Sequence, residues 1–225
     1  MLVEILSATF SPKDTAIAIN FMMIVFAITI VYASSAERVA THIGLLALQG
    51  VVLFGLALVE LKHISWGNLL FILAETFIFK ALIIPYYLRR IVIRNKLAKK
   101  VETAVPSYYI LMLVSVAIII FYLFAFSLSD KLQSKYFTVS ISAIFTGVLL
   151  ILTHKGIIGH LIGYLIIENG IFLLSLAIGS EMPMIVNTCI LMDILISVLV
   201  LGVFVDRIGH KFSTMQIQEL AELKD

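Results

Sequence analysis

The sequence predicts an all-α polytopic membrane protein with about seven transmembrane helices. Composition, apolar runs and the placement of charges carry this prediction. The 225 residues are 61% hydrophobic and 13% charged, against about 45–50% and about 25% in an average soluble domain. The mean hydropathy is +1.11. A water-soluble fold is excluded, because so few polar side chains cannot cover a globule and the apolar excess must face lipid.

Seven stretches are long enough to cross the bilayer core, which takes about 20 predominantly apolar residues and about 17 at the least. They are 16–33, 41–59, 66–88, 107–126, 137–153, 156–179 and 182–205. The first stretch has a signal peptide as its alternative, because Ala-Ser-Ser-Ala at 33–36 resembles a cleavage site. An uncleaved helix is favoured, since Glu4, Lys13 and Asp14 stand where a signal peptide has a positive region.

The distribution of Lys and Arg predicts the orientation, with the N-terminus outside and the C-terminus cytoplasmic. The loop after the third stretch is strongly basic, and such loops stay in the cytoplasm. Its cations are Arg89, Arg90, Arg94, Lys96, Lys99 and Lys100. By alternation, Lys13, Lys62, Lys131 and Lys135 fall on the outer side, while Arg38, Lys155, Arg207, Lys211 and Lys224 join the cytoplasmic side. Trp66 and the Tyr86-Tyr87 pair are expected at opposite interfaces.

The same basic loop divides the chain into two predicted segments. Residues 1–106 form a three-helix N-terminal membrane segment that ends in the basic cytoplasmic linker, and residues 107–225 form a four-helix segment. The linker is amphipathic enough to continue the third helix along the membrane surface. A solvated loop whose charges serve only to fix topology is the favoured interpretation, because a basic run beside a helix end needs no further purpose.

Six polar residues at membrane depth are the candidates for chemistry: Glu75, Lys80, His160, Tyr164, Glu168 and Asp193. A charge at the bilayer centre costs about 2.5–3.5 kcal/mol on insertion scales, so it persists only when it is paired, hydrated or neutralised. Burial raises the pKa of a carboxyl group and brings its proton exchange towards working pH. These residue types at this depth therefore indicate a proton path.

The sixth and seventh stretches each carry one carboxyl group near the middle. Tyr164 and His160 precede Glu168 by four and eight residues, so the three share one helix face and lead from the cytoplasmic end to the midplane. Asp193 lies at the midpoint of the next stretch, where it could share protons with Glu168. The alternative is that these groups serve helix packing and association.

The third stretch carries Glu75 and Lys80, which are five residues apart and about 140° apart around a helix. Each is therefore expected to have its partner on another helix. Pro85 removes the helical bond to Ala81 and is expected to loosen the turn that bears Lys80. The lysine either modulates proton affinity or forms a static pair. Gln49 is expected to be a packing point with a hydrogen bond to a neighbouring helix.

Several classes of site and partner are not expected. The single cysteine, Cys189, can form neither an internal disulfide nor an iron–sulfur or zinc site. We therefore predict no cofactor, no metal and no catalytic residue in this chain. The net charge of +2 is arranged by membrane side, so no nucleic-acid partner is expected.

The whole chain resembles hydrogenase-4 component E, a membrane subunit of formate hydrogenlyase-type complexes. The features that carry the resemblance are LLALQG at 45–50, KALIIPYYLRR at 80–90, GYLIIENGIFL at 163–173 and the polar tail that follows FVDR at 204–207. From residue 137 onward the chain is similar to the three-helix K subunit of respiratory complex I and to the C subunit of Mrp antiporters. This resemblance implies that the last three predicted helices form a K-subunit-like unit.

In the K subunit, two buried glutamates belong to the proton-conducting axis of the membrane arm. The matching run places Leu165 at the first of these positions, which is a departure from the family, and Asp193 at the second. Glu168 lies one turn from Leu165 and points nearly the same way, so a shifted carboxyl is the inferred substitute. Residues 1–129 have no counterpart there, so that comparison assigns no role to Glu75 or Lys80.

The expected function is that of a non-redox, non-enzymatic membrane-arm subunit of a complex I-like hydrogenase or antiporter-type complex in the inner (plasma) membrane. Its expected partners are lipid, larger antiporter-like subunits and either a hydrogenase or another redox arm. The alternative is a structural spacer, which Gly147, Gly163 and Gly170 favour because small residues permit close helix contact. A free-standing transporter is disfavoured, since no inverted repeat or broken helix pair is recognisable.

Overall fold

The computed structural model describes residues 12–60, 70, 73–94, 100–127 and 134–178. Its elements are α2 (Pro12–Ser35), α3 (Val39–Glu60), η1 (Glu75–Ile83), α5 (Ile84–Arg94), α6 (Ser107–Ser127), α7 (Ser134–Thr153) and α8 (Ile157–Ile178). All of these elements are helical, which confirms the all-α prediction for this part of the chain. Five of them, α2, α3, α6, α7 and α8, are long and apolar enough to cross a membrane. The predicted seventh span lies outside the described residues, so the number seven stays a prediction.

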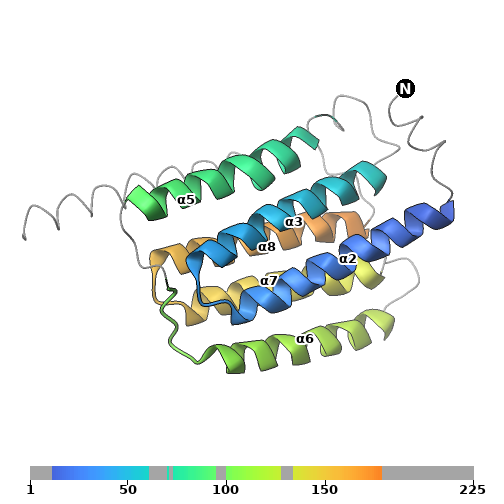
Figure 1. Ribbon diagram of the computed structural model, residues 1–225. Helices are drawn as coiled ribbons and strands as arrows, with labels where there is room; N and C mark the ends of the chain where they lie inside the picture. Colours follow the sequence, from blue (N-terminus) through green and yellow to red (C-terminus); the bar gives the residue numbers. More distant parts are fainter. Residues whose placement is uncertain (1–11, 61–69, 71–72, 95–99, 128–133, 179–225) are drawn as a thin grey trace, which may run out of the picture.

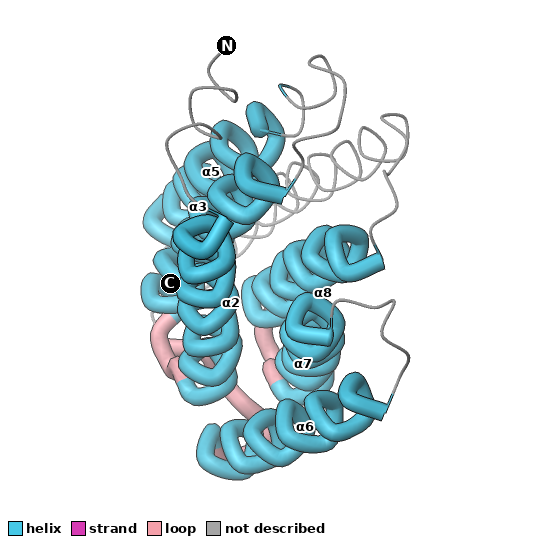
Figure 2. Tube along the Cα trace, turned by 90° about the vertical axis from the view of Figure 1, so that its right-hand side faces the viewer, coloured by secondary structure: helices cyan, strands magenta, loops and turns pink. Residues whose placement is uncertain are grey.

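The helices lie side by side in two layers (Figures 1 and 2). One layer holds η1 with α5, then α3, then α2, and the other holds α8, α7 and α6. Contacts of α3 with α8 and of α2 with α6 and α7 join the layers. Gln49 on α3 and Asn169 on α8 meet at the α3–α8 contact and are 0% and 3% exposed. Side chains on this contact are therefore shielded from lipid.

The packing separates a buried face of each helix from an apolar outer face. Fully buried side chains such as Phe26, Leu53 and Ile162 fill the space between the layers. Large apolar side chains such as Phe21 on α2 and Ile119 on α6 are exposed. Such an apolar exterior is typical of a lipid-facing surface. The helices thus bury polar groups inside and present hydrocarbon outside.

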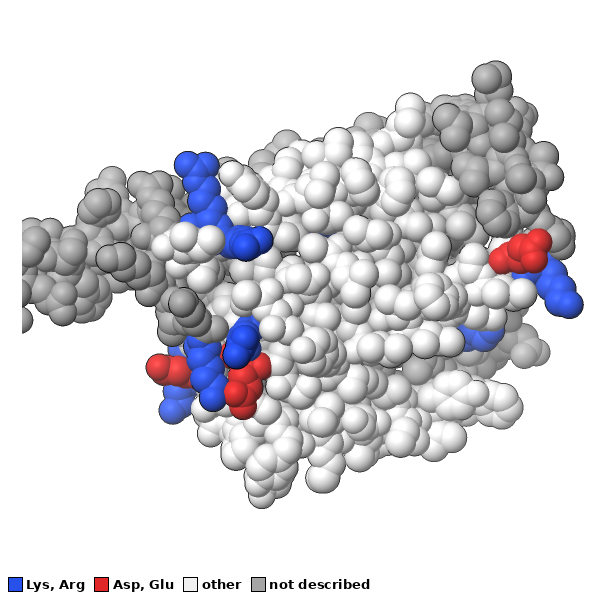
Figure 3. Space-filling model, in the orientation of Figure 1, with Lys and Arg blue, Asp and Glu red and all other residues white. Residues whose placement is uncertain are grey.

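On the face drawn in Figure 3, the described Lys, Arg, Asp and Glu side chains gather at the two ends of the bundle and leave an apolar band between them. One end is closed by three backbone segments, 36–39, 100–106 and 154–156, which we call the end cap. The Val101 N–H donates to the Glu37 carbonyl over 2.7 Å, and the Lys155 N–H donates to the Glu102 carbonyl over 3.0 Å. Lys135 lies at the other end, where its Nζ donates to Asn20 Oδ1. Exposed cations thus lie at both ends of the bundle (Figure 3), and the membrane side to which each end belongs stays a prediction.

The third predicted span is a π-helix followed directly by an α-helix. In η1 the hydrogen bonds span five residues, as in the bond from the Ile84 N–H to the Phe79 carbonyl. Pro85 follows two residues after the end of η1 and has no N–H to donate. In a regular α-helix its ring would clash with the carbonyl group of Ala81, and the wider π-helical turn lies directly before it. Lys80 lies within this segment, as its predicted loosening requires. The helix then continues to Arg94, beyond the predicted end at residue 88.

Helices α7 and α8 cross at two glycines that face one another. A Cβ on Gly147 would lie 2.5 Å from the Gly163 carbonyl oxygen, and a Cβ on Gly163 would lie 2.7 Å from the Gly147 carbonyl oxygen. The two backbones are therefore in direct contact, as in other small-residue crossings between membrane helices. This crossing fixes the depth at which α8 presents its polar residues.

We expect Gly147→Ala to lower the free energy of unfolding by about 1–3 kcal/mol, because the new methyl group would press on backbone rather than on a mobile side chain. Gly44→Ala is the matched control, since Gly44 is an exposed helix glycine with no atom within 4 Å of its Cβ position. Alanine there should leave stability unchanged or raise it by up to about 1 kcal/mol. Reversible unfolding of the purified protein in mixed micelles measures both. Equal effects of the two variants would contradict the crossing.

Candidate functional site

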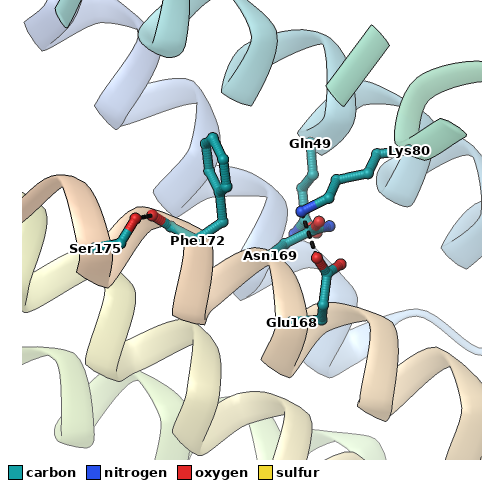
Figure 4. Close-up of polar contacts among 6 residues, drawn as sticks. All are labelled: Gln49, Lys80, Glu168, Asn169, Phe172 and Ser175. Atoms are coloured by element: carbon teal, nitrogen blue, oxygen red, sulfur yellow. Dashed lines mark hydrogen bonds and ion pairs between the residues drawn. The ribbon is translucent and has the colours of Figure 1, made fainter. Parts of the chain in front are cut away.

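An ion pair between η1 and α8 is buried inside the bundle. Lys80 Nζ contacts Glu168 Oε1, and the two side chains are only 3% and 7% exposed. The ammonium group also lies 4.7 Å from the centroid of the Phe172 ring, which is a cation–π contact. Figure 4 shows the two charged groups pointing toward one another from facing helices. The structure thus gives Lys80 the interhelical partner that its position predicts.

Beside this pair, buried side-chain hydrogen bonds join α8, α3 and α2. Asn169 Nδ2 donates to Gln49 Oε1 over 3.1 Å, and Gln49 Nε2 donates to Thr29 Oγ1 over 3.0 Å. Thr29 Oγ1 in turn donates to the Phe26 carbonyl over 2.6 Å. Gln49 is 0% exposed, and Asn169 directly follows Glu168 in α8. We call the five side chains the polar network: Thr29, Gln49, Lys80, Glu168 and Asn169.

A close approach of two backbones positions the network. A Cβ on Gly50 would lie 2.7 Å from the Ala81 nitrogen and 2.8 Å from the Lys80 carbonyl carbon. Glycine at 50 therefore lets η1 lie directly on α3, beside Gln49. The wide turn of η1 then directs Lys80 across to α8. The predicted interhelical hydrogen bond of Gln49 is confirmed.

The chemistry available to the network is proton transfer. In a low dielectric, an ammonium and a carboxylate in contact are stabilised by mutual attraction but lose the hydration energy of both charges. A charge brought near the pair would act on the two partners in opposite directions. Within the described residues no group of three or more His, Cys, Asp or Glu side chains could hold a metal ion.

Some residues of the predicted proton path are among those that the structure describes. His160 is exposed, Tyr164 is half-buried against the core and Glu168 is buried, so burial increases along the predicted ladder on α8. Glu75 begins η1, but its side chain lies outside the described residues, as does the whole of Asp193. The relay through these residues stays a prediction.

Sequence reasoning missed two features of the site. Asn169 and Thr29 were not singled out, although an amide or hydroxyl within an apolar stretch is a signal of the same kind as Gln49. It also missed the histidines at the end cap. The rings of His42 and His154 meet edge to face with centroids 5.8 Å apart, and they are 1% and 4% exposed. Their approach required the tertiary structure, because more than a hundred residues separate them in the chain.

The His154 imidazole lies in the turn between α7 and α8, outside the membrane-spanning helices. Burial lowers its pKa from 6.5 to about 4, and repulsion from the nearby His42 and His160 acts in the same direction. A backbone hydrogen bond at Gly159 partly opposes this shift. His154 is therefore neutral at physiological pH.

Comparisons with known proteins find one distant relative. The chain is 26% identical over 188 residues to the Uncharacterized protein Rv0085 of Mycobacterium tuberculosis, which covers 80% of this chain and 84% of the relative. No protein-family model matches the chain. No solved structure matches it either. The similarity extends over most of both proteins, but the relative is uncharacterized, so the similarity assigns no activity to this chain.

Removing one member of the ion pair should destabilise the protein more than removing both. We expect Lys80→Met or Glu168→Met alone to lower the free energy of unfolding by about 3–5 kcal/mol, because each leaves an uncompensated buried charge. The double variant should recover most of that loss. The exposed pair of Lys100 and Glu37 is the control, and its methionine variants should change stability little. Additive effects at Lys80 and Glu168 would refute the pairing.

The end cap should weaken in acid because of His154. Its folded-state pKa is lowered, so the unfolded chain binds the extra proton first and stability falls as the pH drops from 6.5 towards 4. His154→Gln should flatten the stability curve across this window, as measured by unfolding at a series of pH values. His160→Gln, at an exposed position, should retain the acid dependence. An unchanged slope in His154→Gln would contradict this account.

Proposed function

We propose that this chain is a non-redox membrane-arm subunit of a complex I-like hydrogenase or antiporter-type complex, in which the polar network handles protons. In this proposal the chain has seven spans, an outer N-terminus and a cytoplasmic C-terminus, and lies in the inner (plasma) membrane. Its partners are lipid, larger antiporter-like subunits and either a hydrogenase or another redox arm. The resemblance of LLALQG, KALIIPYYLRR and GYLIIENGIFL to hydrogenase-4 component E supports this assignment.

The observation that carries the proposal is the buried contact of Lys80 with Glu168. A static pair at this depth is a weak stabiliser, because the desolvation of two charges offsets their attraction. A pair that exchanges its proton, by contrast, needs this kind of shielded environment. Charge arriving on a neighbouring subunit would favour one protonation state, and the proton would be released when the charge leaves.

The remaining predicted residues extend this path in the proposal. His160 and Tyr164 lead from one end of α8 to Glu168, with increasing burial along the way. Asp193 exchanges protons with Glu168, and Glu75 modulates Lys80. Glu168 takes the place of the family glutamate whose position here is occupied by Leu165, a buried apolar residue one turn away.

A spacer subunit that seals larger antiporter-like subunits is the second candidate. The backbone contact of Gly147 with Gly163 favours it, because such a crossing produces a thin, rigid helix pair. The buried hydrogen bonds of Gln49 with Thr29 and Asn169 also suit a static role, since they hold three helices in register. The two candidates predict different effects on proton transport when a titratable group is removed.

We expect Glu168→Gln to reduce proton-coupled activity of the assembled complex by about 100-fold or more, the range typical of a lost proton-transfer group. The complex is purified from native membranes through a tag on this chain, its subunits are identified by mass spectrometry, and proton transport is measured after reconstitution. Asp14→Asn, which removes an exposed carboxyl at the start of α2, should leave transport unchanged.

The spacer candidate predicts a different result for the same variants. Glu168→Gln would then either transport normally or lose its partner subunits during purification. Normal transport by an intact Glu168→Gln complex would overturn the proton-handling proposal. Recovery of the chain without any antiporter-like partner would overturn the assignment to a membrane arm.

A further inference from the structure

His42 lies in an unusual setting for a histidine. It is fully buried near the start of α3, and both ring nitrogens face backbone carbonyl oxygens. Nδ1 lies 3.1 Å from the Arg38 oxygen, and Nε2 lies 3.1 Å from the Ala33 oxygen. The Ala33 carbonyl belongs to the last turn of α2, where carbonyls lack an intrahelical partner.

The protonated ring can make a hydrogen bond at both nitrogens here, whereas the neutral ring can make one. A carbonyl oxygen only accepts hydrogen bonds, so both contacts are bonds only when both ring nitrogens carry hydrogen. A neutral ring donates one bond and sets the lone pair of its other nitrogen against a carbonyl oxygen. Burial opposes the charge of the imidazolium, and the two carbonyls stabilise it. The setting of His42 thus acts on its charged form in both directions.

His154 limits the pair to a single proton. Its ring meets that of His42 at 5.8 Å, so a second positive charge there would meet strong repulsion. The other His, Lys, Arg, Asp and Glu side chains that the structure describes at this end are exposed: Glu37 and Arg38 beside α2, Arg89 and Arg90 on α5, Lys100 and Glu102 in residues 100–106, Lys155 beside His154, and His160 on α8. Their effects on His42 are screened by water.

A polar cleft of about 540 Å³ opens on the same end cap. Glu37 and Glu102 line it together with Lys100 and Lys155. Thr103, which also lines it, pairs with His154 through the backbone. Water in this cleft and its carboxylates can therefore exchange protons close to the histidine pair.

We propose that His42 is a proton-binding site at the end cap, which takes up a proton from the cleft and delivers it toward the polar network. A proton from hydronium binds the bare ring nitrogen to form imidazolium, and the proton on the other nitrogen then leaves to water, which restores the neutral ring. His42 and Gln49 lie two turns apart on one face of α3, about 10.5 Å along the helix axis. The delivery step rests on the proposed function, whereas the binding step does not.

Nitrogen-15 NMR of the full-length protein in lipid nanodiscs tests the binding step directly. Histidine is isotopically labelled, and the His42 signals are assigned by their loss in His42→Gln, whose amide can still donate to the Ala33 carbonyl. We expect the His42 ring to change from one N–H to two within about pH 5 to 8, the range of histidine chemistry. His154 should stay neutral across that range. A His42 ring that keeps a single N–H down to pH 5 would overturn the site.

Transport by the reconstituted complex tests the delivery step. We expect His42→Gln to slow proton transport by about tenfold or more, even when the proton-motive force is saturating. Asp14→Asn is again the control. Wild-type transport in His42→Gln, alongside lost transport in Glu168→Gln, would overturn delivery through His42 and leave the proposed function intact. A titrating His42 in a complex whose Glu168→Gln variant transports normally would support the binding site and overturn the proposed function.

Discussion

The buried pair of Lys80 and Glu168 is the interaction on which the arrangement of this bundle depends. Each charge is costly inside an apolar protein, and the cost is offset only when the two groups meet. Several features of the fold serve that meeting. Gly50 lets η1 lie on α3, the π-helical turn before Pro85 carries Lys80, and the glycine crossing with α7 fixes the depth of α8.

The amide groups beside the ion pair give the bundle its register. Gln49 bonds to α2 on one side and to α8 on the other, so a shift of any one helix would leave a buried amide unsatisfied. Apolar packing alone tolerates many helix rotations, since one apolar side chain can replace another. The polar network therefore selects one arrangement of α2, α3 and α8 among many that would bury the same area.

The end cap relates the interior of the bundle to its surface. Residues 100–106 bond to the turn between α2 and α3 and to the turn between α7 and α8, so three connections far apart in sequence form one unit. His42 and His154 meet at this end, and the polar cleft is lined by residues of the same connections. Exposed charges and buried histidines thus lie at one end of the bundle.

The sequence by itself determined the apolar helices, their approximate limits and the polar residues that need an explanation. Hydropathy is a local property, so the stretches that became α2, α3, α6, α7 and α8 were recognisable without any contact. The free-energy cost of a polar group at membrane depth identified Lys80, Glu168 and Gln49, because such a group requires a partner.

Only the tertiary structure decided which partners these groups find. The pairing of Lys80 with Glu168, of Gln49 with Thr29 and Asn169, and of His42 with His154 joins positions 20 to 120 residues apart. Such pairings depend on how helices are ordered and rotated against one another, and single-helix periodicity carries no information on either. The sequence could therefore say that Lys80, Glu168 and Gln49 need partners, and the packing of the helices determined which residues these are.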